Sequence, residues 1–342
     1  MKRCLPLILS LFALAVPASA AAATTFGAQV GADFTNQRSG VWTQDTVVAN
    51  LKDLYTAGGR VGRSDSSWQL TETKAPKRGR HTYNWAYNDM IETDMASARL
   101  RWEPTLAFAP NWAEVHRSRV LHLKSGKAIA YLPPASNATF AAYATAFMKR
   151  YGPHGAFWKA NRTLPYVPVT SVEVWNEPDN IHDWGTDINL SDYTRMYEAV
   201  RTAVHRVDRS ARVITGGLAW TESSLPRLLK AFRGKPMDAL AIHPYGANPS
   251  QSIKVAKDAL ADMSKGGRGR TPVFANEYGW TSIRDTWGTT KAKNVKPYAY
   301  NALIGLAKLR LAEIAPFSWA DPSWGLSTGS YANAVAKIQH RR

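Results

Sequence analysis

Two kinds of apolar pattern alternate along this chain. Short apolar stretches rich in β-branched and aromatic residues predict strands, and longer stretches with apolar residues every three or four positions predict helices. The predicted strands lie at 25–34, 60–65, 102–110, 171–178, 211–217, 238–245, 271–279 and 314–321. Helical patterns fill the intervals, among them 43–59, 87–98, 137–152, 190–208, 225–232 and 298–311.

The helical pattern at 190–208 is the clearest of these. Ser191 is a suitable N-cap residue, because its hydroxyl can accept a hydrogen bond from the first turn. The apolar positions that follow it at helical spacing, which we expect in the core, are Tyr193, Met196, Tyr197, Val200, Val204 and Val207.

Eight strand and helix pairs predict an α/β fold, specifically a (β/α)8 TIM barrel. Repeated strand-helix-strand connections favour parallel strands that are covered by helices. We expect one catalytic domain over 21–342, and a doubly wound open sheet is the alternative.

The first twenty residues read as a secretory signal peptide. Lys2 and Arg3 precede an apolar run at 5–16 and a small-residue segment, which predicts cleavage near Ala20 and a secreted protein. An N-terminal membrane anchor is the alternative. No later segment has eighteen uninterrupted apolar residues, so no membrane span is expected in the mature chain, which would also lack the single cysteine, Cys4.

The chain is strongly basic. Its formal net charge is +17, and removal of Lys2 and Arg3 leaves +15, because the leader has no acidic residue. Such a charge attracts polyanions. Nucleic acid is not the expected partner, since no zinc-finger spacing, basic leucine-zipper pattern or RNA-recognition signature is present. We expect a monomer.

Polar and aromatic residues gather where the predicted strands end, which is the active face of a barrel of this type. The segment "SVEVWNEPD" at 171–179 illustrates this, because an apolar strand ends on an amide and a carboxylate. The residues at the strand ends are Arg63, Asp65, Glu177, His243, Tyr245, Glu277 and Trp319.

The two motifs "VEVWNEPD" and "PVFANEYGW" resemble the acid/base and nucleophile motifs of the clan A retaining glycoside hydrolases. Further segments resemble family 39, which includes β-xylosidases and α-L-iduronidases: "GRSDSSW", "YNWAYND", "TLAFAPNWA", "RYG" and "SWGLST". The resemblance covers nearly the whole mature chain.

The resemblance implies a role for each matching residue. Glu177 would be the acid/base and Glu277 the nucleophile, about 5–5.5 Å apart as retention requires. Asn176 would contact the sugar 2-hydroxyl, Tyr245 would hydrogen-bond Glu277, and Arg63 would favour the ionised form of that nucleophile.

Other interpretations stay open for the individual residues. Either glutamate alone could be solvated or part of an ion pair. His243, in "HPY", could be a structural histidine rather than a substrate-binding one, and Arg63 could merely neutralise Asp65.

Several tryptophans lie in or beside the predicted strand-to-helix loops, where an indole can serve as a platform for a sugar ring. We expect about half of this set to line the cleft: Trp68, Trp112, Trp184, Trp280, Trp319 and Trp324. Trp85 and Trp102 are expected in the core.

Basic segments at 74–80, 116–127 and 291–296 fall in loops predicted on the catalytic face, whereas 265–270 falls on the opposite face. This distribution is consistent with an acidic polysaccharide substrate, or with a basic surface that favours solubility. The long loop at 111–134 could wall the cleft. No metal or cofactor is expected, because no zinc, calcium or nucleotide motif is present.

The sequence therefore predicts a secreted retaining glycoside hydrolase that acts on a polysaccharide or oligosaccharide. Two alternatives remain. The barrel could bind a polymer without cleaving it, or the same two glutamates could perform transglycosylation. The sugar and its linkage are not specified.

Overall fold

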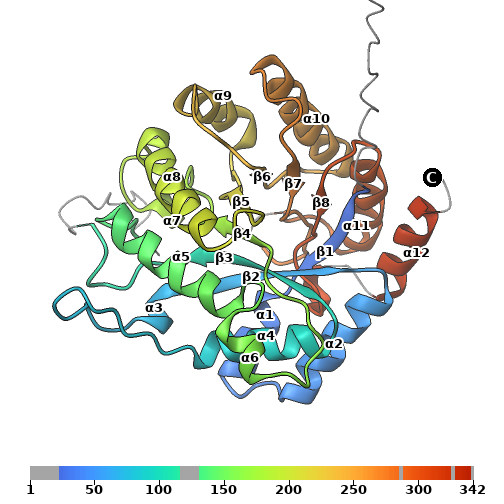
Figure 1. The fold of residues 1–342 in the computed structure, drawn as a ribbon. Helices are drawn as coiled ribbons and strands as arrows, with labels where there is room; N and C mark the ends of the chain where they lie inside the picture. Colours follow the sequence, from blue (N-terminus) through green and yellow to red (C-terminus); the bar gives the residue numbers. More distant parts are fainter. Residues whose placement is uncertain (1–22, 116–130, 285–287, 325–327, 340–342) are drawn as a thin grey trace, which may run out of the picture.

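The computed structural model describes residues 23–115, 131–284, 288–324 and 328–339. The predicted signal peptide at 1–20 and the basic segment at 116–127 lie outside these residues. Eight parallel strands form the predicted (β/α)8 barrel, with helices around it (Figure 1). The strands are β1 Thr25–Gln29, β2 Val61–Ser67, β3 Arg101–Ala107, β4 Ser171–Val174, β5 Arg212–Thr215, β6 Leu240–Ile242, β7 Val273–Ala275 and β8 Glu313–Ile314.

The strands follow the order β5-β4-β3-β2-β1-β8-β7-β6, so sequential neighbours pair around the barrel and β1 pairs with β8. The seam between β5 and β6 is closed by two isolated parallel bridges, Ile214 with Ala239 and Leu218 with Ile242. All strands run in the same direction. Every strand therefore ends on one face of the barrel, which we call the catalytic face, and begins on the other, which we call the base.

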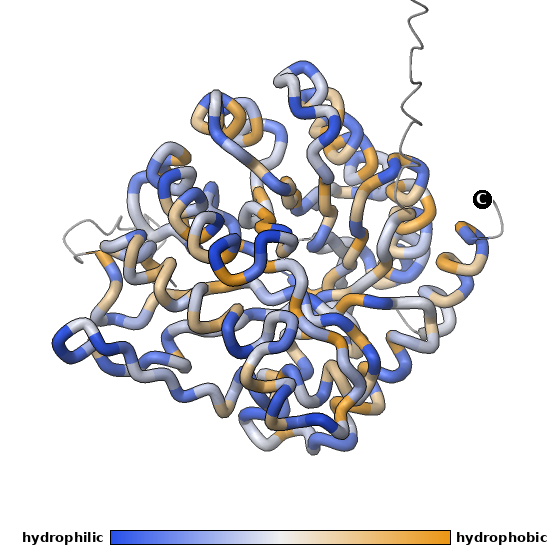
Figure 2. Tube along the Cα trace, viewed as in Figure 1, coloured by the Kyte–Doolittle hydropathy of each residue, from blue (hydrophilic) through white to orange (hydrophobic). Residues whose placement is uncertain are grey.

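The helices pack their apolar sides against the strands. Figure 2 shows hydrophobic residues concentrated toward the middle of the molecule and hydrophilic ones on the outer turns and loops. The helices are α1 Gly31–Arg38, α2 Gln44–Thr56, α3 Trp68–Thr71, α4 Ala86–Ser97, α5 Asn137–Tyr151, α6 Ala156–Ala160, α7 Ile181–Trp184, α8 Leu190–Val207, α9 Thr221–Ala231, α10 Pro249–Lys265, α11 Ala292–Ala307 and α12 Thr328–Gln339. Over the described ranges, no helix has the length and apolar character needed to cross a bilayer.

The core confirms the predicted apolar face of α8. Its buried residues include Tyr193, Met196, Tyr197, Val200 and Val204, while Val207 is partly buried against the same core. Trp102 is fully buried and Trp85 partly buried, as expected for core residues.

The structure corrects two local predictions. The strand expected at 25–34 stops at Gln29, whose side-chain oxygen accepts a hydrogen bond from the Gly31 amide (2.8 Å) and turns the chain into α1. Ser191 does not cap α8. Asn189 caps it instead, because its side-chain oxygen accepts from the amides of Ser191 and Asp192.

Candidate active site

The end of β4 carries the first catalytic candidate. Regular pairing stops at Val174, and the chain then adopts left-handed backbone conformations at Trp175 (φ 69°) and Glu177 (φ 39°). Such conformations are costly for residues with a β-carbon and occur frequently at functional sites. Here they accompany a nearly buried carboxylate, that of Glu177, which is 7% exposed.

Both carboxylate oxygens of Glu177 have partners. Its Oε1 lies 2.8 Å from Nδ1 of His243, and its Oε2 accepts a hydrogen bond from the side-chain amide of Asn180 (2.6 Å). Burial opposes ionisation of Glu177, but the hydrogen bond and charge of His243 outweigh burial and lower its pKa. Burial likewise opposes the charged imidazole, yet the neighbouring carboxylates of Glu277 and Glu177 raise the pKa of His243.

Glu277 follows β7 and is held from two sides. Tyr245 donates its hydroxyl to Oε1 (3.0 Å), which confirms the contact that the family resemblance implied. Arg63 donates from Nη1 to Oε2 (3.0 Å). The Glu277 side chain is 15% exposed, so it is more accessible than Glu177.

Arg63 connects several parts of the site. It lies within β2 rather than at its end, so the predicted placement was slightly wrong. Its Nε donates to the buried Glu173 (2.7 Å) and its Nη2 to Asn176 (2.8 Å), in addition to Glu277. Arg63 therefore orients the amide beside Glu177 and the second carboxylate. It forms its ion pairs with Glu173 and Glu277 rather than with Asp65.

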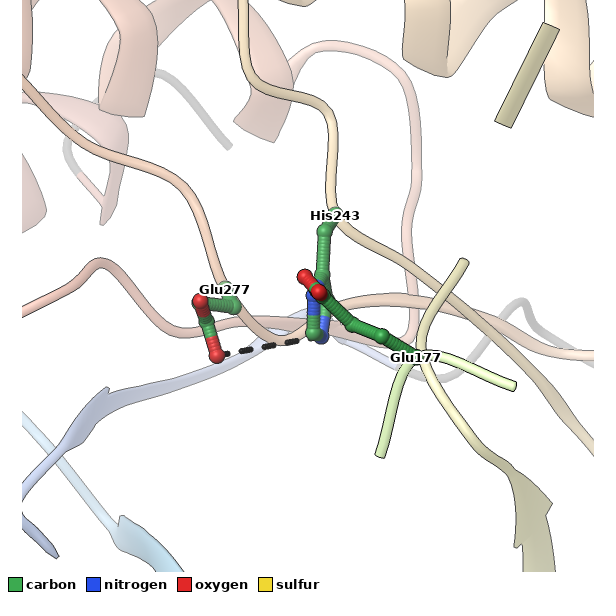
Figure 3. Close-up of side chains that lie close together, drawn as sticks. All are labelled: Glu177, His243 and Glu277. Atoms are coloured by element: carbon green, nitrogen blue, oxygen red, sulfur yellow. Dashed lines mark hydrogen bonds and ion pairs between the residues drawn. The ribbon is translucent and has the colours of Figure 1, made fainter. Parts of the chain in front are cut away.

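The two candidate carboxylates lie close together. One oxygen of Glu177, one ring nitrogen of His243 and one oxygen of Glu277 lie within 4.8 Å of one another. Figure 3 shows the imidazole between the two glutamate side chains. Carboxylates and an imidazole can ligate a metal ion. Here the first carboxylate already pairs with the imidazole and the second with a guanidinium, which fits acid-base chemistry better than a cation site.

Sequence reasoning missed three polar residues that hold the site. Glu173 lies within β4. Its carboxylate accepts hydrogen bonds from the side chains of Arg63 and Thr105 (2.7 Å) and from the Gly217 amide (2.9 Å). Asn180 binds Glu177, as described above. The only sequence signal for Glu173 was a carboxylate in an apolar strand, which is costly without partners.

Asp183 is the third missed residue. Its carboxylate accepts a hydrogen bond from the side chain of Asn176 (2.6 Å). Burial and the nearby charge of Glu177 raise the pKa of Asp183 to about 8. At neutral pH this carboxyl is therefore mostly protonated, which limits the negative charge around Glu177.

Most of the tryptophans that were predicted in or beside the strand-to-helix loops are buried. Trp112 is half-buried and keeps its candidacy as a subsite wall. Buried indoles at four other predicted positions point into the packing between strands and helices: Trp68, Trp184, Trp280 and Trp319. The Trp319 indole, for example, donates to the carbonyl oxygen of Asn50 in α2 and packs against Tyr331 in α12. These four indoles are therefore part of the hydrophobic core.

Two other aromatic residues that follow strands are less buried than those four tryptophans. Phe317, after β8, is only partly buried and packs edge-on against the nearly buried Trp324 (ring centroids 4.6 Å apart). Trp220, after β5, is 50% exposed. Its amide and that of Ala219 donate to the carboxylate of Asp179 (2.9 Å each), which ties Trp220 to the segment that carries Glu177.

Comparison with known proteins identifies solved structures that share this fold. No family model and no curated protein sequence matches the chain. A family 39 β-xylosidase from Caulobacter crescentus has the same fold at TM-score 0.65 and 18% identity, covering 94% of this chain and 72% of that chain. An endo-1,4-β-mannanase from Rhizomucor miehei gives TM-score 0.65 at 15% identity, covering 93% of this chain and 95% of that chain.

A family 39 enzyme from Xanthomonas axonopodis pv. citri gives TM-score 0.63 at 15% identity, with 86% of this chain covered. The present chain spans only 58% of that enzyme's length. In its fold, this chain is similar to clan A glycoside hydrolases of families 39 and 5.

Proposed function

We propose that this chain is a glycoside hydrolase that cleaves O-glycosidic bonds with retention of configuration, with Glu277 as nucleophile and Glu177 as acid/base. The observation that carries the proposal is the short separation of the two glutamates, since a carboxylate oxygen of Glu177 lies within 4.8 Å of one of Glu277. Retaining enzymes hold their carboxyl groups about 5–5.5 Å apart, whereas inverting enzymes leave about 6.5–9.5 Å for a water molecule.

In the first step a Glu277 oxygen attacks the anomeric carbon while the bond to the leaving oxygen breaks, and Glu177 gives a proton to that oxygen. In the second step Glu177 takes a proton from water, the water oxygen bonds to the anomeric carbon, and Glu277 is released. Arg63 and Tyr245 hold the attacking carboxylate in place through the two hydrogen bonds described above.

The proton for the first step has a defined place in the resting site. The pKa of Glu177 is lowered and that of His243 is raised, so the proton of this pair lies on the imidazole. His243 Nδ1 and Glu177 Oε1 are 2.8 Å apart, which allows direct transfer to the glutamate as the leaving group arrives. His243 thus acts as the proton store of the acid/base.

Asn176 completes the arrangement. Arg63 donates to its amide oxygen and the amide nitrogen donates to Asp183, so the amide orientation is defined on both sides. This supports the contact with the sugar 2-hydroxyl that the family resemblance implied, since a hydrogen bond there can strengthen as the transition state develops.

The test is reducing-end release, with mass spectrometry of the products, from a panel that includes xylan, mannan, β-glucan and acidic polysaccharides. The mature protein is compared with Glu277→Ala and with a matched surface control, Glu222→Ala, whose carboxylate pairs only loosely with Lys254 (3.8 Å). We expect activity in the wild type and the control and loss of activity in Glu277→Ala. Proton NMR of the first product should show the anomer of the substrate linkage.

Each contrary result has a defined meaning. Equal activity in all three proteins would remove Glu277 as nucleophile, and initial inversion would contradict the double displacement. No detectable release of reducing ends by any of the proteins, with retained binding to one polymer, would favour a barrel that binds a polysaccharide without cleaving it. Products longer than the substrate would identify transglycosylation by the same two glutamates.

We also propose that the protein works outside the cytoplasm after removal of its leader. The support is the charged, apolar and small-residue sequence of residues 1–20. N-terminal sequencing of the protein recovered from outside the producing cell should begin near Ala21. A retained Met1 would contradict this proposal.

A further inference from the structure

The base of the barrel is strongly basic. The segments that enter the strands from the preceding helices are 57–60, 98–101, 152–170, 208–212, 232–239, 266–272 and 308–312. All seven contain lysine or arginine, thirteen in total, against only Asp208 and Asp238. The thirteen are Arg60, Arg99, Arg101, Lys159, Arg162, Arg209, Arg212, Arg233, Lys235, Arg268, Arg270, Lys308 and Arg310.

These side chains are available to a partner. Ten of the thirteen are exposed, the exceptions being Arg101, Lys235 and Arg268. Among the ion pairs of the described residues, only Lys235 of this set takes part in one, with Glu198. Asp238 forms an ion pair with Arg201 of α8. The seven segments therefore carry a net charge of +11, out of +17 for the whole chain.

The base is also hollowed. A cavity of about 750 Å³ lies beneath β1 to β4, and its lining includes Arg60, Arg99 and Arg101 together with the hydroxyl-bearing Thr25 and Thr170. The Nε of Arg101 is buried there with no hydrogen-bond partner among the described residues. Guanidinium and hydroxyl donors around a hollow suit a carboxylate or similar anionic group.

The opposite face has a different character near the catalytic glutamates. The segment 175–189 contains Glu177, Asp179, Asp183 and Asp187 and no lysine or arginine. The segments 74–80 and 291–296 of the catalytic face are basic as well, with a net charge of +7. The charge of the base lies at the opposite end of the strands from Glu177 and Glu277, so it needs a partner other than the sugar bound at these glutamates.

We infer that the base of the barrel is a docking surface for an anionic polysaccharide, bound through carboxylate groups repeated along its chain. The segments at the base present positive charges at several separate positions, which suits a long, flexible polyanion with repeated carboxylates. Duplex nucleic acid is usually read by a helix or strand pair inserted in a groove, and single strands by several exposed aromatic rings. Among the described residues the base offers one strongly exposed aromatic ring, that of Tyr166. The inference does not depend on the proposed hydrolysis.

The experiment measures binding of the mature protein to polygalacturonate, to neutral dextran and to a duplex DNA oligonucleotide, at about 50 mM and about 500 mM NaCl. The base variant combines Arg162→Gln, Arg209→Gln, Arg233→Gln and Arg270→Gln, which are exposed and belong to four different segments. The control variant removes the same number of charges from exposed positions on the catalytic face, through Lys74→Gln, Lys77→Gln, Lys291→Gln and Lys293→Gln.

We expect salt-sensitive binding to polygalacturonate that weakens at least about fivefold in the base variant and less than about twofold in the control. Equal losses in both variants would reduce the effect to net charge and overturn the inference. A larger loss in the control would place the contact on the catalytic face. Tighter binding to DNA than to polygalacturonate, or equal binding to dextran, would show that the class of partner is wrong.

Discussion

The imidazole of His243 lies directly against the α-carbon of Gly217. A β-carbon built on Gly217 would lie 2.0 Å from Nε2 and 2.3 Å from Cδ2 of that ring. These distances are far below any van der Waals contact, so the ring occupies the space that a side chain at 217 would need. Because Nδ1 of the same ring contacts Glu177, the absent side chain helps to position the acid/base.

Replacement of Gly217 by alanine should therefore displace His243. We expect Gly217→Ala to lower kcat/KM about tenfold or more and to cost roughly 1–3 kcal/mol of stability, since a rigid buried ring must move. Thermal unfolding and steady-state kinetics would check this. Gly329→Ala is the control, because nothing lies within 4 Å of a β-carbon there and the position is helical. Wild-type kinetics in Gly217→Ala would show that the ring relocates without consequence.

The pairing of Glu177 with His243 predicts a pH profile. Removal of the imidazole charge in His243→Gln leaves burial as the main influence on Glu177, so its pKa should rise. In the wild type the alkaline limb of kcat/KM reports loss of the proton held by His243, and in the variant it reports Glu177 alone, so we expect the limb to shift and the maximum to fall because the proton store is lost. His154→Gln, an exposed histidine, is the control. A pH profile unchanged in both position and height would contradict the role of the Glu177 and His243 pair as the acid/base.

Asp183 predicts how stability changes with pH. Its folded pKa of about 8 lies above its ordinary value of 3.8, so between these values the folded chain holds a proton that the unfolded chain has released. Its contribution to stability therefore falls as pH rises through this window. Asp183→Asn should remove that loss, giving about 1–3 kcal/mol more stability than wild type at pH 8 and little difference at pH 4. Thermal unfolding across this range, with the exposed Asp187→Asn as control, would test it. A parallel offset at every pH would refute the titration argument.

Substitution of Trp220 should change substrate binding without changing the chemical step. Its indole is half exposed, and its backbone amide is hydrogen-bonded to Asp179, two residues after Glu177. We expect Trp220→Ala to raise KM for a polymeric substrate about fivefold, through loss of stacking, with kcat nearly unchanged. Hydrolysis of a single sugar with a small leaving group should be affected less. Tyr166→Ala, an equally exposed aromatic residue at the base, should leave both constants unchanged.

The architecture could be predicted from the sequence because it depends on a repeated local pattern, the alternation of strand and helix periods. Glu177 and Glu277 could be placed at strand ends because their motifs follow apolar strands directly. The lengths of β6, β7 and β8 could not be predicted, since only two or three residues in each form regular pairs and the apolar run continues beyond them.

The contacts within the site were harder to predict than its members. Arg63 reaches Glu173 and Glu277 across 110 and 214 residues of sequence, and such contacts depend on the register of several strands together. The burial of Trp319 was missed for a related reason, because a strand-end residue can face the helices as readily as the cleft. No periodicity indicates which way such an indole turns.

The seam between β5 and β6 has a consequence for heat sensitivity. The proposed acid/base Glu177 follows β4, on the β5 side of this seam, and its hydrogen-bond partner His243 follows β6, on the other side. Only a few backbone bonds cross it, among them Leu218 to Ala241 (3.3 Å) and His243 to Leu218 (3.0 Å). Where few bonds hold two strands, local opening costs less than global unfolding. On warming, we expect amide exchange to accelerate first at Leu218 and His243, and the contact between Glu177 and His243 to be lost while the barrel as a whole is still folded.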